Sequence, residues 1–388
     1  MAGGGVGWYG DRGRRPKRRG VAGEVGGTMS QRMIEQFMEM VRIDSESGNE
    51  ARFIEYLEGE LEKLGAEAGT DGYGNLIATL PAKNSTVTEP ILLSCHADTV
   101  QPGVGIEPVL EGGVIRSAGD TILGADDKAG IAEMLEALRV APVRPPVEIA
   151  ISRQEEVGLL GVKNLDYSRI TARRGFLLDN DTLDTIVIGG PSYFAIDVEI
   201  TGRSAHAGME PEKGINAIVA AARAIAALPL GRIDERSTAN VGVIEGGIIR
   251  NGVPDRCTFL AECRSLDHDT AQRLADTMAA TIRREVEAMG ATVEINVDNL
   301  CRAVDIPDDA PTVEIAKRAL RKAGVEATTT FITGFTDASI YNNHGIEMAV
   351  VGIGAREEHA TTEHIHVADM ERALNMVVEI LRLTGEGA

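Results

Sequence analysis

Much of this chain alternates between short runs rich in β-branched residues and longer helical stretches. The segments 91–95, 147–152 and 175–179 have the composition of strands, and segment 128–140 has the apolar spacing of a helix. Such alternation is typical of parallel sheets covered by crossover helices. We therefore expect an α/β fold with a largely parallel sheet.

The middle of the chain follows a different order of segments. Helix–strand alternation resumes at Pro311, so we expect one α/β domain made of residues 29–192 and 299–388, with residues 193–298 inserted as a smaller α+β domain. The order β-α-β-β-α-β within the insert is that of a ferredoxin-like domain. Its expected strands and helices are, in order, 193–201, 212–227, 240–244, 257–264, 270–289 and 291–297.

The first 28 residues differ from the rest, with six basic residues against two acidic ones and ten of the 44 glycines. They lack the apolar core of a signal peptide. We expect residues 1–28 to be a disordered tail, or to lie before the true start if that is Met29. Apolar residues after Ser30 recur with helical spacing, so Ser30 is the expected N-cap of the first helix.

Charge and cysteine content exclude several classes of function. The net charge of −20 argues against a nucleic acid or an anionic membrane as partner, because both need basic patches. No apolar run reaches the roughly 18 residues of a membrane span. The four cysteines form no CxxC pair, which argues against a thiolate zinc cluster or a disulfide framework and favours a reducing cytoplasm.

Polar residues follow the predicted strands, and functional groups of such sheets gather at these strand ends. His96 and Asp98 come directly after segment 91–95; a neutral imidazole could bind zinc, and the carboxylate could orient it. Asp126 and Asp127 occupy a glycine-bounded turn before a helix. They could cap the helix and interact favourably with the positive N-terminal end of its dipole, or one carboxylate could bridge two metals.

Three more positions extend this pattern. Glu155 and Glu156 follow segment 147–152, where one could bind metal and the other act as a base, although adjacent glutamates usually lie on a solvated surface. Asp179 ends another strand and could instead initiate a turn. The densest histidine cluster lies near the C-terminus and contains His359, His364 and His366.

One ligand from each of five strand ends is what two zinc ions sharing a carboxylate would require. Neither a G-x-S-x-G nor a GxxxxGK[ST] motif suggests another chemistry. The order of the motifs resembles that of the di-zinc exopeptidases, which include peptidase T, glutamate carboxypeptidases, aminoacylases and succinyl-diaminopimelate desuccinylase. The resemblance spans about residues 33 to 383 and is nearest to the peptidase T-like branch. It is most specific in segments 94–100, 119–132, 154–158 and 359–363.

The resemblance implies a zinc-exopeptidase-like catalytic domain with an inserted ferredoxin-like dimerisation, or lid, domain. It implies that His96 and Asp179 bind one zinc, that Asp126 bridges both metals, and that Glu156 and His359 are further ligands. His359 is preferred over the two later histidines because a glutamate follows it by four residues, as in the family. The family often holds the peptide bond between the two aspartates of the acidic turn in cis.

The same resemblance implies a mechanism. Two zinc ions per subunit lower the pKa of a bridging water toward ~7, which makes hydroxide available at neutral pH. Glu155 would act as general base toward this water and later donate the proton to the leaving amine, while Asp98 orients a ligand. Co²⁺ or Mn²⁺ could replace Zn²⁺, because affinity alone does not decide which metal is bound.

Three residues outside the metal site also receive roles from the resemblance. His206 would stabilise the oxyanion from the partner subunit, which implies a homodimer. Arg264 would bind the C-terminal carboxylate of the substrate, and Asn251 would lie on the substrate side. The alternatives are an ordinary turn histidine, a salt bridge from Arg264 to Glu262 or Asp267, and an asparagine needed only for its turn.

The loop Gly334–Ser339 departs from the family pattern. Relatives commonly have glycine where Phe335 stands and asparagine where Ser339 stands. A phenyl ring there would reshape the floor of the pocket, which leaves the metals untouched but puts the substrate in doubt.

We therefore expect a cytoplasmic, homodimeric di-zinc metallopeptidase that hydrolyses short peptides, most like a tripeptide aminopeptidase. One alternative is a deacylase or carboxypeptidase that acts on N-acyl amino acids with the same metal site. A remoter alternative is a metal-dependent binding protein without catalytic activity.

Overall fold

The computed structural model describes residues 26–388, so most of the expected tail at 1–28 lies outside the described residues. The first helix, α1 (Gly26–Val41), begins before Ser30. The prediction that Ser30 caps this helix is therefore wrong, because the helical backbone already includes it. The apolar residues expected on its inner face, such as Met33 and Phe37, are buried.

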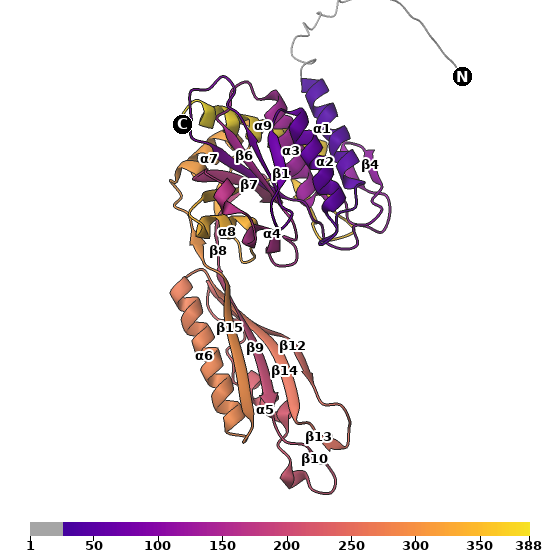
Figure 1. The fold of residues 1–388 in the computed structure, drawn as a ribbon, viewed down its shortest axis with the longest axis vertical. Helices are drawn as coiled ribbons and strands as arrows, with labels where there is room; N and C mark the ends of the chain where they lie inside the picture. Colours follow the sequence, from indigo (N-terminus) through magenta and orange to yellow (C-terminus); the bar gives the residue numbers. More distant parts are fainter. Residues whose placement is uncertain (1–25) are drawn as a thin grey trace, which may run out of the picture.

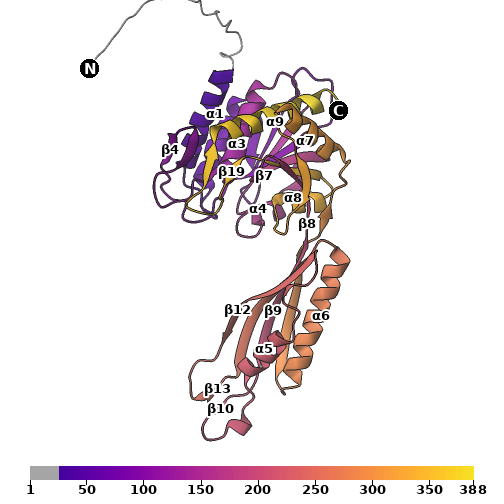
Figure 2. The same ribbon diagram turned by 180° about the vertical axis from the view of Figure 1, so that it is seen from behind.

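A nine-stranded sheet forms the centre of the larger domain, which both ends of the chain build (Figures 1 and 2). Its strand order is β1-β2-β6-β3-β7-β18-β8-β16, with β17 beside β8. The central strands β6, β3, β7 and β18 are parallel, whereas β1, β2 and β16 pair antiparallel. The sheet, expected to be largely parallel, is thus parallel in its middle and between β17 and β8. The strands are β1 (Glu67–Thr70), β2 (Leu76–Leu80), β3 (Ile91–His96), β6 (Val147–Ser152), β7 (Arg174–Asn180), β8 (Thr185–Gly190), β16 (Val304–Asp305), β17 (Thr328–Phe331) and β18 (Glu347–Gly352).

Helices cover both faces of this sheet because successive residues of its strands point to opposite sides. Leu93 belongs to the core that the sheet forms with α1, α2, α3, α7 and α9, whereas its neighbour Leu92 belongs to the core formed with α4 and α8. A small second sheet contains β4 (Pro108–Glu111), β5 (Val114–Ser117), β19 (Ala355–Arg356) and β20 (His364–His366). The helices are α2 (Ala51–Lys63), α3 (Ala125–Val140), α4 (Leu160–Lys163), α7 (Pro311–Lys322), α8 (Asp337–Asn343) and α9 (Val367–Gly385).

The inserted domain has a five-stranded antiparallel sheet in the order β11-β12-β14-β9-β15, with α5 and α6 packed against it. Apart from the short β11, this is the expected ferredoxin-like order. The helix predicted for 212–227 starts only at Ala217, because Asn216 caps it by accepting a hydrogen bond from Val219 N. The elements are β9 (Ser192–Thr201), α5 (Ala217–Ala226), β11 (Gly231–Arg232), β12 (Ser237–Gly246), β14 (Arg256–Ser265), α6 (His268–Glu287) and β15 (Thr292–Cys301).

The inserted domain extends away from the larger domain (Figures 1 and 2). The chain crosses between the domains twice, from β8 to β9 and from β15 to β16. An antiparallel ribbon of two strands that are not consecutive in the chain, β10 (Ala205–His206) and β13 (Gly252–Val253), lies at the far end of the insert. The four cysteines are free and buried. None of the helices within residues 26–388 is both long and apolar enough to cross a membrane.

Candidate metal centre and active site

The predicted metal-site residues meet at the carboxyl ends of the central strands. His96 is the last residue of β3, Asp179 lies near the end of β7, and Glu155 and Glu156 follow β6. His359 follows β18 and the short β19. Because parallel strands end at the same edge of a sheet, positions far apart in the sequence become neighbours there.

Asp126 lies at the centre of this group and faces a histidine with each carboxylate oxygen. Its Oδ1 lies 2.9 Å from Nε2 of His96, and its Oδ2 lies 3.1 Å from Nε2 of His359. The His96 nitrogen is also 3.5 Å from Asp179 Oδ1, and the His359 nitrogen is 2.9 Å from Glu156 Oε1. One carboxylate therefore joins two clusters of potential ligands.

The donor set fits divalent metal ions. Each of the two histidine nitrogens faces two carboxylates, although a ring nitrogen can donate only one hydrogen bond. Glu156 Oε1 is buried and makes no hydrogen bond of normal geometry. Imidazole nitrogens and carboxylate oxygens that converge in this way are the ligands that Zn²⁺ prefers outside thiolate sites.

Two carboxylates hold the acidic turn in place. Glu363 accepts hydrogen bonds from three backbone N–H groups of the turn, at 2.7 to 3.1 Å, one of them from Asp126. Asp127 accepts from the backbone N–H of His96 at 3.0 Å, so its carboxylate already has a structural partner. The Asp126–Asp127 peptide bond is cis. The sequence marked Glu363 only as part of a motif, because nothing in it shows which amides the side chain contacts.

Asp98 connects His96 to the two glutamates. Its Oδ1 lies 3.6 Å from His96 Nδ1 and accepts a hydrogen bond from Glu155 N at 2.8 Å. Its Oδ2 accepts from Ser47 Oγ at 2.7 Å and from Glu156 N at 3.2 Å. The side chain is fully buried, so these contacts fix both the imidazole and the turn after β6.

The site carries an excess of buried negative charge. Burial raises the pKa of Glu155 well above its ordinary value, and the carboxylates of Asp179 and Asp337 raise it further. Burial disfavours the charged form of His96, but the surrounding carboxylates, first that of Asp126, raise its pKa well above the ordinary value. Bound divalent cations would compensate this excess of negative charge, which the positively charged groups of the protein do not balance.

Comparison with known proteins identifies the family. Residues 192–289 match the M20 peptidase dimerisation domain. The uncharacterised protein YqjE of Bacillus subtilis is 38% identical and covers 90% of this chain and 97% of its own length. The crystal structure of aminopeptidase PepT from Bacillus cereus is 39% identical, with a TM-score of 0.85 over 91% of this chain and 98% of its own. A tripeptidase from Staphylococcus aureus is 33% identical, with a TM-score of 0.87 over 92% and 98%.

The chain belongs to the peptidase T-like branch of the M20 peptidases. It is therefore a metal-dependent peptidase. The expected fold class, a catalytic domain with an inserted dimerisation domain, is confirmed.

Two residues of this M20 peptidase that the sequence assigned to the site lie elsewhere in its own chain. His206 and Asn251 lie together at the β10–β13 ribbon, where Ala207 N donates to Asn251 O at 3.0 Å. Figure 1 shows this ribbon at the end of the inserted domain that is remote from the other domain. Neither side chain reaches the metal site of the same chain in this structure.

Arg264 lies at the junction of the two domains, near the end of β14. It pairs with Glu262 at 2.9 Å, and Asp267 is not its partner. It also donates to Thr333 O at 3.0 Å. Three of the five N–H groups of a guanidinium are thus used, which leaves two for another acceptor.

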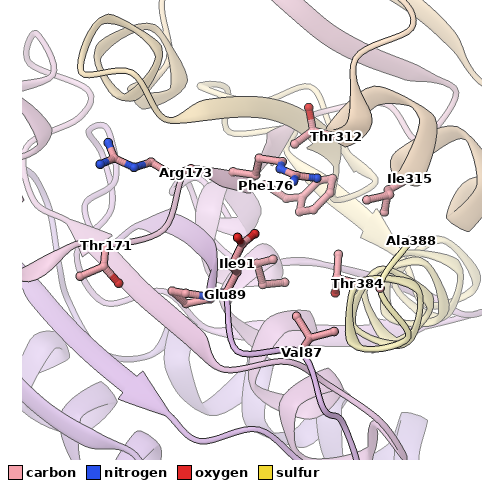
Figure 3. Close-up of a pocket in the computed structure, with 13 residues that line it drawn as sticks. Val87, Glu89, Ile91, Thr171, Arg173, Phe176, Thr312, Ile315, Thr384 and Ala388 are labelled. Atoms are coloured by element: carbon pink, nitrogen blue, oxygen red, sulfur yellow. The ribbon is translucent and has the colours of Figure 1, made fainter.

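A separate cavity of about 410 Å³ lies at the opposite, amino-terminal edge of the central strands (Figure 3). Its lining includes Ile91 at the start of β3, Phe176 of β7 and the C-terminal residue Ala388. None of the predicted site residues lines it. The chemistry of this M20 peptidase therefore belongs to the carboxyl edge, where the metal ligands converge.

Proposed function

We propose that this M20 peptidase is a dinuclear metallo-aminopeptidase that hydrolyses short peptides, most like a tripeptide aminopeptidase. The observation that carries the proposal is the position of Asp126, whose two oxygens face two separate histidine–carboxylate clusters. The B. cereus aminopeptidase and the S. aureus tripeptidase, which match nearly the whole chain, support the same substrate class.

In this proposal His96 and Asp179 would hold one metal ion, Glu156 and His359 would hold the other, and Asp126 would be a ligand to both. We expect two Zn²⁺ per subunit, although Co²⁺ or Mn²⁺ would suit the same donors. When bound, such ions supply Lewis acidity toward the scissile carbonyl and toward water.

Glu155 is the proposed general base. Its backbone N–H is fixed by Asp98, while its carboxylate accepts no hydrogen bond from any residue in the range 26–388. A carboxylate that is held in place but free of partners can take a proton from the attacking water and return it to the leaving amine. Its neighbour Glu156 faces His359 and is therefore suited to a ligand role.

The remaining roles require a second subunit and a bound peptide. We propose that His206 of the partner subunit donates to the developing oxyanion, since the β10–β13 ribbon that carries His206 is remote from the catalytic domain of its own chain. The enzyme would then be a homodimer, and we place it in the cytoplasm. The two free N–H groups of Arg264 would bind the C-terminal carboxylate of the peptide. Asn251 lies beside His206 and would therefore also reach the substrate side from the partner subunit.

The test is hydrolysis of a small panel of tripeptides with free and with acetylated N-termini by the metal-loaded protein. We expect cleavage that requires the free amine and that stops when a chelator is added. Cleavage of the acetylated peptides alone would keep the metal site and contradict the aminopeptidase assignment in favour of a deacylase.

A further inference from the structure

The guanidinium of Arg264 is held from both domains. Within the inserted domain, Glu262 accepts hydrogen bonds from its Nε at 3.2 Å and from its Nη2 at 2.9 Å. Its Nη1 donates to the backbone oxygen of Thr333 at 3.0 Å, and Thr333 belongs to the catalytic domain. A single side chain therefore links the two domains beside their connecting strands.

Two aromatic rings pack against the same guanidinium. Its Cζ lies 4.7 Å from the centre of the Tyr193 ring and 4.8 Å from that of Phe335. The two rings are 5.0 Å apart with 21° between their planes. Both distances from the guanidinium carbon to a ring centre are within the range of a cation–π interaction. Tyr193 comes from β9 of the inserted domain and Phe335 from the loop before α8, so the rings also come from different domains.

The inserted sheet explains half of this arrangement. Arg264 pairs directly with Tyr193 in the β14–β9 register, and Glu262 lies two residues earlier on the same strand. Because side chains alternate along a strand, the three share one face of the sheet. Phe335 is therefore the ring that the catalytic domain contributes to a group already formed on the other domain.

The loop that carries Phe335 is also attached to the floor of the metal centre. Asp337, two residues further on, is buried and accepts a hydrogen bond from Ser152 Oγ. Ser152 is the last residue of β6, the strand that leads to Glu155. The position of Phe335 is thus tied to the strand that delivers the proposed general base.

We propose that Phe335 is a positioning residue that fixes Arg264 across the domain junction and so makes this peptidase selective for peptides with a free C-terminal carboxylate. The inference rests on the proposed role of Arg264 and adds that the role depends on a ring of the other domain. Glu262, Thr333 and the two rings keep the guanidinium from turning. The two remaining N–H groups of the guanidinium can then donate hydrogen bonds to the C-terminal carboxylate of the peptide.

The first test compares a tripeptide with its C-terminal amide. For Phe335→Leu we expect kcat/KM for the tripeptide to fall about three- to thirtyfold through KM, the range of one cation–π contact, while the amide changes less than about twofold. Phe335→Tyr should restore the preference for the acid. Phe331→Leu is the matched control, because Phe331 is a nearby phenylalanine at the end of β17 whose exposed ring lies over Gly189.

Hydrogen exchange tests the junction without turnover. In Phe335→Leu the amides of residues 333–337 should exchange faster than in the wild type, whereas those of α6 should not change. Unchanged exchange, or an acid-to-amide ratio equal to that of the wild type, would overturn the inference. A wild type that cleaves acid and amide equally would also overturn it, yet leave the peptidase function standing. A wild type that cleaves no peptide would instead contradict the proposed function, and exchange would still decide whether Phe335 holds the junction.

Discussion

Glu155 and Glu156 are adjacent in the sequence but differ in their surroundings. Glu156 Oε1 lies 2.9 Å from His359 Nε2, whereas the Glu155 carboxylate meets no hydrogen-bond donor among the described residues. Asp98 accepts a hydrogen bond from the backbone of each and so fixes the turn that separates their directions. This difference is the structural basis for assigning one residue to the metals and the other to proton transfer.

The two glutamates should therefore fail in different ways when changed to glutamine. Glu155→Gln removes the proton acceptor but no proposed ligand, so kcat should fall by about a hundredfold or more while the metal content stays near that of the wild type. Glu156→Gln should lower both activity and metal content. Steady-state kinetics with elemental analysis of the dialysed proteins measures both. Wild-type turnover in Glu155→Gln would refute its role as base.

At the residue scale, the sequence was sufficient to predict which side chains gather at the metal site, but not what holds them, nor that His206 and Asn251 lie far from it in the same chain. His96, Asp126 and Asp179 could be predicted because each follows a recognisable strand or opens a helix. The contacts of Glu363 with the acidic turn could not be predicted, because they join positions up to 240 residues apart. Local periodicity carries no information about such pairs.

Helix α3 brings Asp126 to the strand ends because Gly130 allows a close approach to β7. A β-carbon at Gly130 would lie 2.7 Å from Leu178 O and 2.3 Å from Asp127 Oδ1. Both distances are shorter than a normal contact, and the first involves rigid backbone. The start of α3 is constrained as well: Gly124, its N-cap, lies two residues before Asp126 and adopts a left-handed conformation with φ of 71°.

Gly130→Ala should therefore destabilise the protein by about 1–3 kcal/mol, the usual range for overpacking. Its metal affinity should also fall, since the acidic turn must shift. Gly59→Ala is the matched helical control, because a β-carbon there meets nothing within 4 Å. That change should be neutral or should stabilise by about 0.5–1 kcal/mol. Urea denaturation of the two variants compares them, and equal stabilities would contradict the account of α3.

The elements themselves were predicted better than their pairing. The segment 91–95 corresponds to β3, and 147–152 coincides with β6. The antiparallel pairing of β1 and β2 at one edge was not predicted, because strand direction depends on the neighbour that a strand finds in the folded sheet. The late start of α5 was missed because Asn216 was read as part of the helix and not as its cap.

At the scale of the whole molecule, two domains are joined by two connectors and by the cluster around Arg264. The β10–β13 ribbon that carries His206 lies at the far end of the inserted domain, away from the catalytic domain of its own chain (Figure 2). A complete active site would then need the β10–β13 ribbon of a second subunit.

Mixed dimers test this arrangement. His206→Ala and Glu155→Gln should each be nearly inactive as homodimers. If His206 acts on the partner's site, heterodimers formed by co-expression should recover activity, because the His206→Ala subunit keeps its Glu155 and receives His206 from the other chain. No recovery in verified heterodimers would mean that His206 acts within its own chain or not at all.

The central claim is that Asp126 bridges two metal ions, and anomalous X-ray diffraction at the zinc absorption edge from crystals of the zinc-loaded protein tests it most directly. We expect two peaks per chain, one between Asp126, His96 and Asp179 and the other between Asp126, His359 and Glu156. A single peak, or peaks that do not contact Asp126, would contradict the account.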